Sequence, residues 1–211
     1  MSPKKIDLLF KALTQSIPDP VSELNYQSIY QLLVAVILSA QATDVSVNKV
    51  TPKLFQEAPT PEEMVVLGID KIRSHIKSIG LYNAKAQNIF NCSKMLIEEY
   101  DSKVPDVREH LERLPGVGRK TAGVVLNIAY KQATIPVDTH VFRVSNRTGL
   151  VKAKTPDKTE MQLMKVVPSW AGNTAHHLLI LHGRHICKAK KPLCSQCCIC
   201  EYCDFPEKRL D

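Results

Sequence analysis

The chain has 211 residues, of which 44% are hydrophobic and 23% are charged. This composition can build a buried core and excludes wholesale disorder. Lysine and arginine number 28 against 21 aspartates and glutamates, so the formal net charge is +7. Such a charge suits a polyanionic partner, although many soluble proteins carry it without one.

Segments that would insert into or cross a membrane are not evident. The longest apolar run, Leu32 to Leu38, is far shorter than the about 20 residues that a membrane helix needs. The N-terminus has lysines but no apolar stretch of the roughly 7–15 residues that a secretory signal needs. We therefore expect no membrane partner and a cytoplasmic, reducing location.

The first half of the chain predicts helices with identifiable starts. Residues 29–41 are mostly apolar and predict a buried helix, and Asp44 could cap the helix that follows. Thr60 and Glu63 form a capping box with Pro61 at the first helical position, so another helix begins there.

Further helix ends are marked by glycines and polar residues. Gly68 and Gly80 fall where helices would stop. Asn83 is placed to cap the next helix, and Asp106 with Glu109 repeats the capping-box pattern.

The second half continues the helical pattern. Residues 178–181 are expected inside a buried helix, and residues 133–137 alternate like a strand but are interrupted by Pro136. One helix shows an apolar stripe at helical spacing: Val117, Thr121, Val124, Val125 and Ile128. We therefore predict an all-α protein.

The most informative segment is Leu114–Ala122, which reads Leu-Pro-Gly-Val-Gly-Arg-Lys-Thr-Ala. Pro115 ends one helix, and Gly116 and Gly118 permit a tight turn with close backbone approach. N–H groups at the start of the next helix can then seat a phosphate without reading base sequence. Arg119 replaces the glycine that a P-loop requires. A plain helix–turn–helix corner is the alternative.

This segment resembles the helix-hairpin-helix of the DNA glycosylase superfamily. Residues 136–140, Pro-Val-Asp-Thr-His, are similar to that superfamily's catalytic aspartate segment. Residues 39–44 and 79–82 resemble its endonuclease III branch, and the similarity extends from about residue 24 to residue 203.

The resemblance implies two all-α domains with the active-site cleft between them. One is a six-helix domain at residues 22–131, which contains the hairpin. The other combines residues 1–21 with residues 132–211. We expect a monomeric bacterial protein, associated with the chromosome, that binds double-stranded DNA containing damaged pyrimidines or abasic sites.

Lys120 and Asp138 are the catalytic candidates. From the sequence alone, Lys120 could contact a phosphate or act as a nucleophile when neutral, and Asp138 is best explained as a helix N-cap. The resemblance implies that the Lys120 amine attacks C1′ of the deoxyribose and forms a Schiff base, after which β-elimination expels the 3′ phosphate. It makes Asp138 the carboxylate that assists glycosidic bond cleavage, which is compatible with capping.

Other DNA contacts follow from the resemblance. Gln41 and Leu81 could be a helix-end polar residue and a core leucine, but the resemblance implies that both wedge into the duplex when the target base turns out. Hairpin residues are expected at the DNA backbone: Gly116, Gly118 and Arg119. Three basic residues after Asp138 are expected near phosphates: His140, Arg143 and Arg147. The alternative is that they form a solvated basic face.

The C-terminal cysteines indicate a metal site, because disulfides are rare in a reducing compartment. Thiolate ligation suits an iron–sulfur cluster or structural zinc, and the spacing does not choose between them. The resemblance implies a structural [4Fe–4S] cluster held by four residues: Cys187, Cys194, Cys197 and Cys203.

Two further cysteines, Cys198 and Cys200, depart from the family pattern and create a second possible quartet that omits Cys187. We expect neither to be a ligand, and we expect Cys92 in the core. Between the first two ligands lie three lysines that could face a phosphate backbone: Lys188, Lys190 and Lys191. We expect Lys191 to contact the DNA.

Together these features predict a bifunctional DNA glycosylase and apurinic/apyrimidinic lyase that removes oxidised pyrimidines in base excision repair. An adenine-mismatch glycosylase is one alternative, but Lys120 is present and Ile37 falls where its catalytic glutamate would be. A non-catalytic DNA-binding module is the other, and it would need neither Lys120 nor Asp138.

Overall fold

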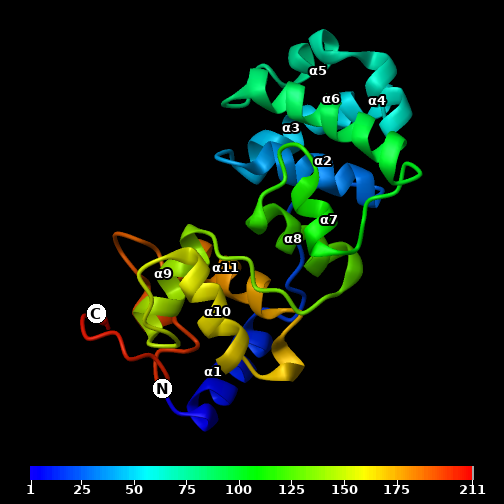
Figure 1. Cartoon of the computed structure of the whole chain (residues 1–211). Coiled ribbons are helices and arrows are strands. Elements are labelled where there is room, and N and C mark those ends of the chain that lie inside the picture. Colours follow the sequence, from blue (N-terminus) through cyan, green and yellow to red (C-terminus); the bar gives the residue numbers. More distant parts are fainter. Residues whose placement is uncertain (211) are drawn as a thin grey trace. The chain divides into compact units, whose positions relative to one another are not determined.

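The computed structural model describes residues 1–210, and across them it contains eleven α-helices, two short 3-10 helices and no strand (Figure 1). The prediction of an all-helical protein is confirmed. Residues 131–138, where an interrupted strand was conceivable, have no regular secondary structure. None of the described helices combines the length and the apolar character that spanning a membrane requires.

The chain divides into two compact units. One consists of residues 23–131, and the other joins residues 1–22 to residues 132–211. That each unit is a domain able to fold independently stays a prediction.

The unit of residues 23–131 is built around one apolar core, with α2 at its centre. Every residue of α2 from Tyr30 to Leu38 is buried, and α3, α6 and α8 pack against it. The unit has seven helices (Figure 1): α2 (Ile29–Ser39), α3 (Asp44–Glu57), α4 (Pro61–Leu67), α5 (Ile69–Ile76), α6 (Tyr82–Glu99), α7 (Arg108–Arg113) and α8 (Arg119–Tyr130).

Local signals explain several helix ends in this unit. Thr60 and Glu63 form the predicted capping box of α4. Gly68, with φ of +80°, ends α4, as expected, and precedes α5. The unit has seven helices, where the resemblance implied six. Gly80 does not end a helix, because α5 already stops at its C-cap Lys77.

Three predicted caps are wrong. In each case the capping position, which needs a backbone conformation outside the helix, belongs to a residue within two positions of the expected one. The caps are Thr43 rather than Asp44 for α3, Leu81 rather than Asn83 for α6, and Val107 rather than Asp106 for α7.

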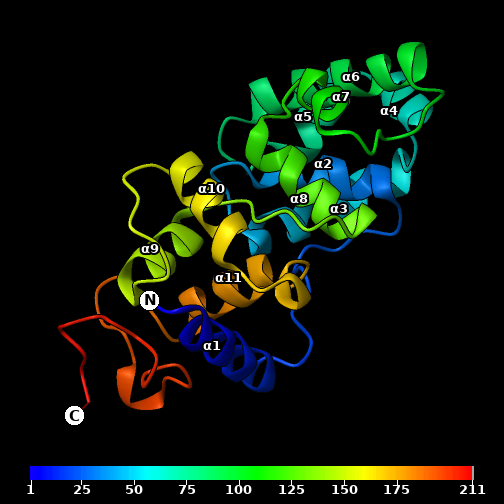
Figure 2. The same ribbon diagram turned by 60° about the horizontal axis from the view of Figure 1, so that its bottom comes forward.

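The second unit centres on α11, which packs against both α9 and α1 (Figure 2). Gly183 allows the close approach of α9, because a Cβ there would lie 3.0 Å from the His140 Cβ and the Val144 Cγ2. The helices are α1 (Pro3–Ser16), α9 (Thr139–Thr148), α10 (Pro156–Val166), η1 (Ser169–Ala171), α11 (Ala175–His185) and η2 (Cys194–Gln196). After α11 and up to residue 210, the chain is irregular apart from the short η2 (Figure 2).

Candidate functional site

The hairpin between α7 and α8 is a tight turn that only glycine suits at position 116. Gly116 has φ of +81°, and a Cβ there would lie 2.9 Å from the Asn88 Cβ of α6. Leu114 and Val117 on either side are buried, and the Val117 N–H donates to the Leu114 carbonyl at 3.0 Å. The turn is therefore pinned to the core beneath it.

The outer side of the hairpin is open. Gly118 is the N-cap of α8, no side chain caps this end of the helix, and a Cβ on Gly118 would meet nothing within 4 Å. Gly118, Arg119 and Lys120 are all exposed. An acceptor from outside the protein can therefore approach the backbone here, at the positive end of a twelve-residue helix.

Lys120 is the second residue of α8, and its exposed side chain stands beside this open end. Asp138 is the N-cap of α9, as the sequence predicts, and its carboxylate accepts a 2.8 Å hydrogen bond from the Val141 N–H. This bond holds the half-buried carboxylate at the start of α9. Lys120 and Asp138 belong to different units.

Gln41 and Leu81 each combine an exposed side chain with a left-handed backbone, with φ of +54° and +61°, as do Asp101 and Lys131. Leu81 is 59% exposed, so it is not the core leucine that the sequence alone allowed. A left-handed conformation costs a non-glycine residue about 1–2 kcal/mol. Because both side chains are exposed, packing does not offset this conformational cost. Backbone strain of this kind is found at functional positions.

Arg143 of α9 makes its hydrogen bonds within its own unit. Its guanidinium donates to the Gly183 carbonyl at 2.7 Å and to the Cys187 carbonyl at 3.0 Å, and it lies 3.2 Å from the Nδ1 of His140. These bonds tie α9 to α11 and to the start of the cysteine segment. Phosphate contacts of His140 and Arg143 stay a prediction.

Arg147, one turn further along α9, holds the lysine-bearing loop. Its guanidinium donates to the Lys188 carbonyl at 2.8 Å and to the Ala189 carbonyl at 3.0 Å. It also lies 3.6 Å from the Cys187 Sγ and 4.9 Å from the centre of the Phe205 ring. This arginine therefore fixes the loop backbone, while the lysine side chains of the loop are exposed.

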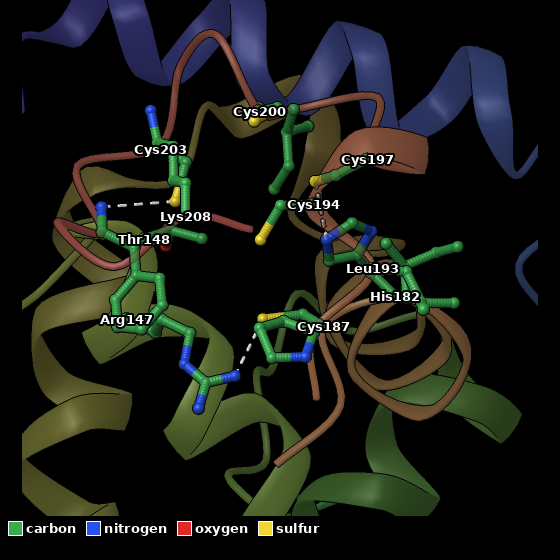
Figure 3. Close-up of a pocket in the computed structure, with 14 residues that line it drawn as sticks. Arg147, Thr148, His182, Cys187, Leu193, Cys194, Cys197, Cys200, Cys203 and Lys208 are labelled. Carbon is green, nitrogen blue, oxygen red and sulfur yellow. Dashed lines mark hydrogen bonds between the residues drawn. The ribbon is translucent and has the colours of Figure 1, made fainter. Parts of the chain in front are cut away.

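A cavity near the C-terminus is lined by thiols from the segment of residues 187–203. Figure 3 shows Cys187, Cys194, Cys197 and Cys203 turned toward a common space, with Arg147 and His182 beside it. Five cysteines line this cavity: Cys187, Cys194, Cys197, Cys200 and Cys203. Cys198 does not line it and is exposed, and Cys92 is buried in α6, as expected.

Successive turns bring these thiols together. The N–H groups of Cys197, Cys200 and Cys203 each donate to the carbonyl three residues earlier, at 3.1–3.3 Å. Residues three apart in such turns point to the same side. Cys200 lies among the cavity thiols although the family pattern has no cysteine there, and whether it binds a metal stays a prediction.

The chemistry of the cavity fits a thiolate-bound metal group. Burial raises the pKa of the Cys197 thiol to about 12 and also raises that of Cys203, whereas a bound metal deprotonates a thiol outright. The Phe205 N–H donates to the Cys203 Sγ at 3.4 Å, and His182 Nε2 lies 3.6 Å from the Cys197 Sγ. Among residues 1–210, no three histidine, cysteine or acidic side chains converge to hold a single metal ion; the thiols surround the cavity instead.

Known proteins resemble this chain over most of its length. Residues 34–169 match the model of the HhH-GPD superfamily base excision DNA repair proteins. The chain is 50% identical to endonuclease III of Escherichia coli and 52% identical to that of Haemophilus influenzae, covering 97% of both partners in each case. A solved structure of a trapped endonuclease III–DNA covalent intermediate is 40% identical, with a TM-score of 0.93 and full coverage of both chains. A thermostable thymine-DNA glycosylase is 26% identical, with a TM-score of 0.85 and 98% coverage of both.

Proposed function

The chain belongs to the HhH-GPD superfamily of base excision DNA repair proteins, in its endonuclease III branch, and we propose that it removes oxidised pyrimidines from DNA and cleaves the strand 3′ to the abasic site. The observation that carries this proposal is the position of Lys120, an exposed amine at the open N-terminus of α8. A relative at 40% identity forms a covalent intermediate with DNA, which requires a nucleophile of this kind.

The hairpin acts first, by holding the DNA backbone. A phosphate oxygen accepts from the N–H groups at the start of α8, and the open space around Gly118 lets it come close. Arg119 adds a positive charge on the same exposed turn. These contacts position the damaged nucleotide without reading its sequence.

Lys120 then carries the bond-making steps. Its neutral amine attacks C1′, the C1′–N bond to the base breaks, and the base leaves with a proton. The sugar ring opens to a Schiff base between C1′ and the Lys120 nitrogen. Loss of a proton from C2′ then expels the 3′ phosphate by β-elimination, and water releases the enzyme from the aldehyde.

Asp138 assists the first of these steps. Positive charge develops at C1′ as the base departs, and a fixed carboxylate stabilises it. The hydrogen bond from the Val141 N–H holds this carboxylate in one orientation, so the cap and the catalytic role support each other.

Gln41 and Leu81 open the duplex for this chemistry. Turning a base out of the stack costs a few kcal/mol, and side chains that enter the vacated space offset the cost. Both residues are exposed on strained backbone. Leu81 supplies an apolar wedge, and Gln41 supplies hydrogen-bonding groups.

We further propose that Cys187, Cys194, Cys197 and Cys203 hold a [4Fe–4S] cluster. The thiolate donors, the N–H bond to the Cys203 sulfur and the positive charge of Arg147 all suit such a group. When bound, the cluster supplies a cross-link for the irregular segment rather than a reaction step, because β-elimination transfers no electrons. The loop that carries Lys191 would then be held facing the DNA backbone. We place the protein in the cytoplasm of a bacterial cell.

The test is a duplex that carries one oxidised pyrimidine. We expect release of the damaged base, a strand break 3′ to the site, and a covalent protein–DNA adduct when borohydride is present. A duplex with adenine opposite an oxidised guanine is the control, and it should stay intact. Cleavage of the control alone would indicate an adenine-mismatch glycosylase, and binding with no cleavage of either duplex would indicate a non-catalytic module.

A further inference from the structure

One buried lysine connects the two segments that carry Gln41 and Leu81. Lys85, at the start of α6, is 4% exposed, and its Nζ donates a 2.8 Å hydrogen bond to the Leu38 carbonyl at the end of α2. Its backbone N–H donates to the Leu81 carbonyl at 3.0 Å. The second bond is the regular backbone bond of the first helical turn, so the Lys85 side chain joins the turn that follows Leu81 to the chain three residues before Gln41.

The Leu38 carbonyl needs this donor because α2 ends immediately afterwards. The next N–H groups bond elsewhere: that of Ala40 to the Ile37 carbonyl and that of Ala42 to the Ser39 carbonyl. Carbonyls in the last turn of a helix have no partner within the helix, and positive charge is favourable there. The Lys85 ammonium supplies both the donor and the charge.

The bond between Lys85 and Leu38 also carries a free-energy cost. The side chain is buried, and among residues 1–210 no carboxylate forms an ion pair with it. Burial lowers the pKa of Lys85, since removing an ammonium from water is unfavourable. An apolar side chain of similar length would avoid this cost but would leave the Leu38 carbonyl without its donor, so the lysine is needed for the link between the end of α2 and α6.

We propose that Lys85 is a positioning residue for the wedge: it holds the end of α2 against the start of α6, so that Gln41 and Leu81 enter the duplex at a fixed separation. Gln41 lies three residues after Leu38, so its position depends on where the end of α2 is held. The inference rests on the proposed function and adds to it the group that keeps its two wedge residues in place.

The experiment compares a substrate that needs the wedge with one that does not. A single-stranded abasic oligonucleotide has no base stack to open, whereas a duplex with an oxidised pyrimidine does. In Lys85→Met, we expect base release from the duplex to fall about tenfold or more and cleavage of the single strand to stay at the wild-type rate. Lys94→Met, which alters an exposed lysine on the same helix, should change neither rate.

A double-mutant cycle with Leu81→Ala separates positioning from general structure. If Lys85 acts through the wedge, Lys85→Met should lower duplex activity much less in the Leu81→Ala background than in the wild type. Thermal unfolding of each variant checks that the fold is kept. Should Lys85→Met not fold, Lys85→Arg carries the test, because a longer donor shifts the end of α2 and should still lower the duplex rate relative to the single-strand rate.

Equal losses on both substrates, or fully multiplicative effects in the cycle, would overturn the inference and leave the proposed function standing. An unchanged duplex rate in a folded Lys85 variant would do the same. If the wild-type protein cleaves neither substrate, the proposed function falls and the inference falls with it.

Discussion

The hairpin and the cysteine segment are both proposed to contact DNA, yet they are held in place by different means. The hairpin lies on the apolar core of its unit, with Leu114 and Val117 buried and Gly116 packed on Asn88. The cysteine segment, residues 187–203, contains only three residues of 3-10 helix. Apart from Ile199 and Cys187, which are buried in the core of the unit, its order rests on short turns and on the carbonyls that Arg143 and Arg147 bind.

This difference separates a region shaped by its own packing from one that depends on a bound group. The hairpin should keep its structure whatever happens to the metal. The cysteine segment should lose its structure when the thiols lose their common partner, because a structural metal site contributes folding free energy directly.

Removing a cluster ligand is expected to have the largest effect. Cys187→Ala should abolish most of the iron and sulfide and destabilise the unit that contains it by several kcal/mol. The measurement is iron and sulfide content with the visible absorption band and the unfolding midpoint.

The matched control is the double variant Cys198→Ser with Cys200→Ser, which should keep near-full cluster content. Loss of iron in this double variant, together with retention of iron in Cys187→Ala, would instead establish the quartet that omits Cys187. A colourless wild type that contains zinc would overturn the iron–sulfur proposal and leave the Lys120 chemistry unaffected.

Substituting the two hairpin glycines separates packing from DNA approach. Gly116→Ala places a Cβ at positive φ and 2.9 Å from the Asn88 Cβ, so it should destabilise the protein by about 2 kcal/mol. Gly118→Ala meets no atom within 4 Å and should leave stability nearly unchanged, but its methyl group should weaken DNA binding. Urea unfolding and DNA titration of both variants would measure this; equal stability losses would contradict it.

Much of this account could be predicted from the sequence where a signal is local. The capping box at Thr60, the turn at Gly116 and the cap at Asp138 each depend on a few adjacent residues, and the structure confirms them. The caps expected at Asp44 and Asn83 are wrong: α3 is capped by the neighbouring Thr43, and α6 begins after Leu81 with no side-chain cap at all.

Contacts between distant residues could not be predicted in this way. Lys85 and Leu38 are 47 positions apart, and Arg147 and Lys188 are 41 apart. The exposure of Leu81 on strained backbone likewise depends on the path of the chain after α5. The residue preferences of a leucine do not predict that exposure.

The charge of the basic loop should have a smaller, purely electrostatic effect. Lys191→Ala removes one exposed positive charge, so binding to abasic and undamaged duplexes should weaken by similar factors. The slope of log affinity against log salt should become shallower by about one unit. Lys158→Ala, an exposed charge on α10, is the control; a loss confined to damaged DNA would mean that Lys191 recognises the lesion.

The smallest effect is expected at the tie between α1 and the C-terminal segment. Lys5 donates to Asp204 and holds the pKa of that carboxyl below its ordinary value of 3.8. Since the folded form binds its proton less readily than the unfolded form, the pair's contribution is present above about pH 4 and is lost as the pH falls through the lowered pKa. Asp204→Asn should therefore reduce the loss of Tm below pH 4; an unchanged acid profile would show that the exposed pair contributes nothing.

The central claim is that Lys120 is the nucleophile, and borohydride trapping on an abasic duplex tests it most directly. The wild-type protein should form a covalent adduct whose DNA-bearing peptide contains Lys120. Lys120→Gln should form none, while Lys131→Gln, at the other end of α8, should form the full amount. An undiminished adduct in Lys120→Gln, or a DNA-bearing peptide that contains a different lysine, would contradict the account.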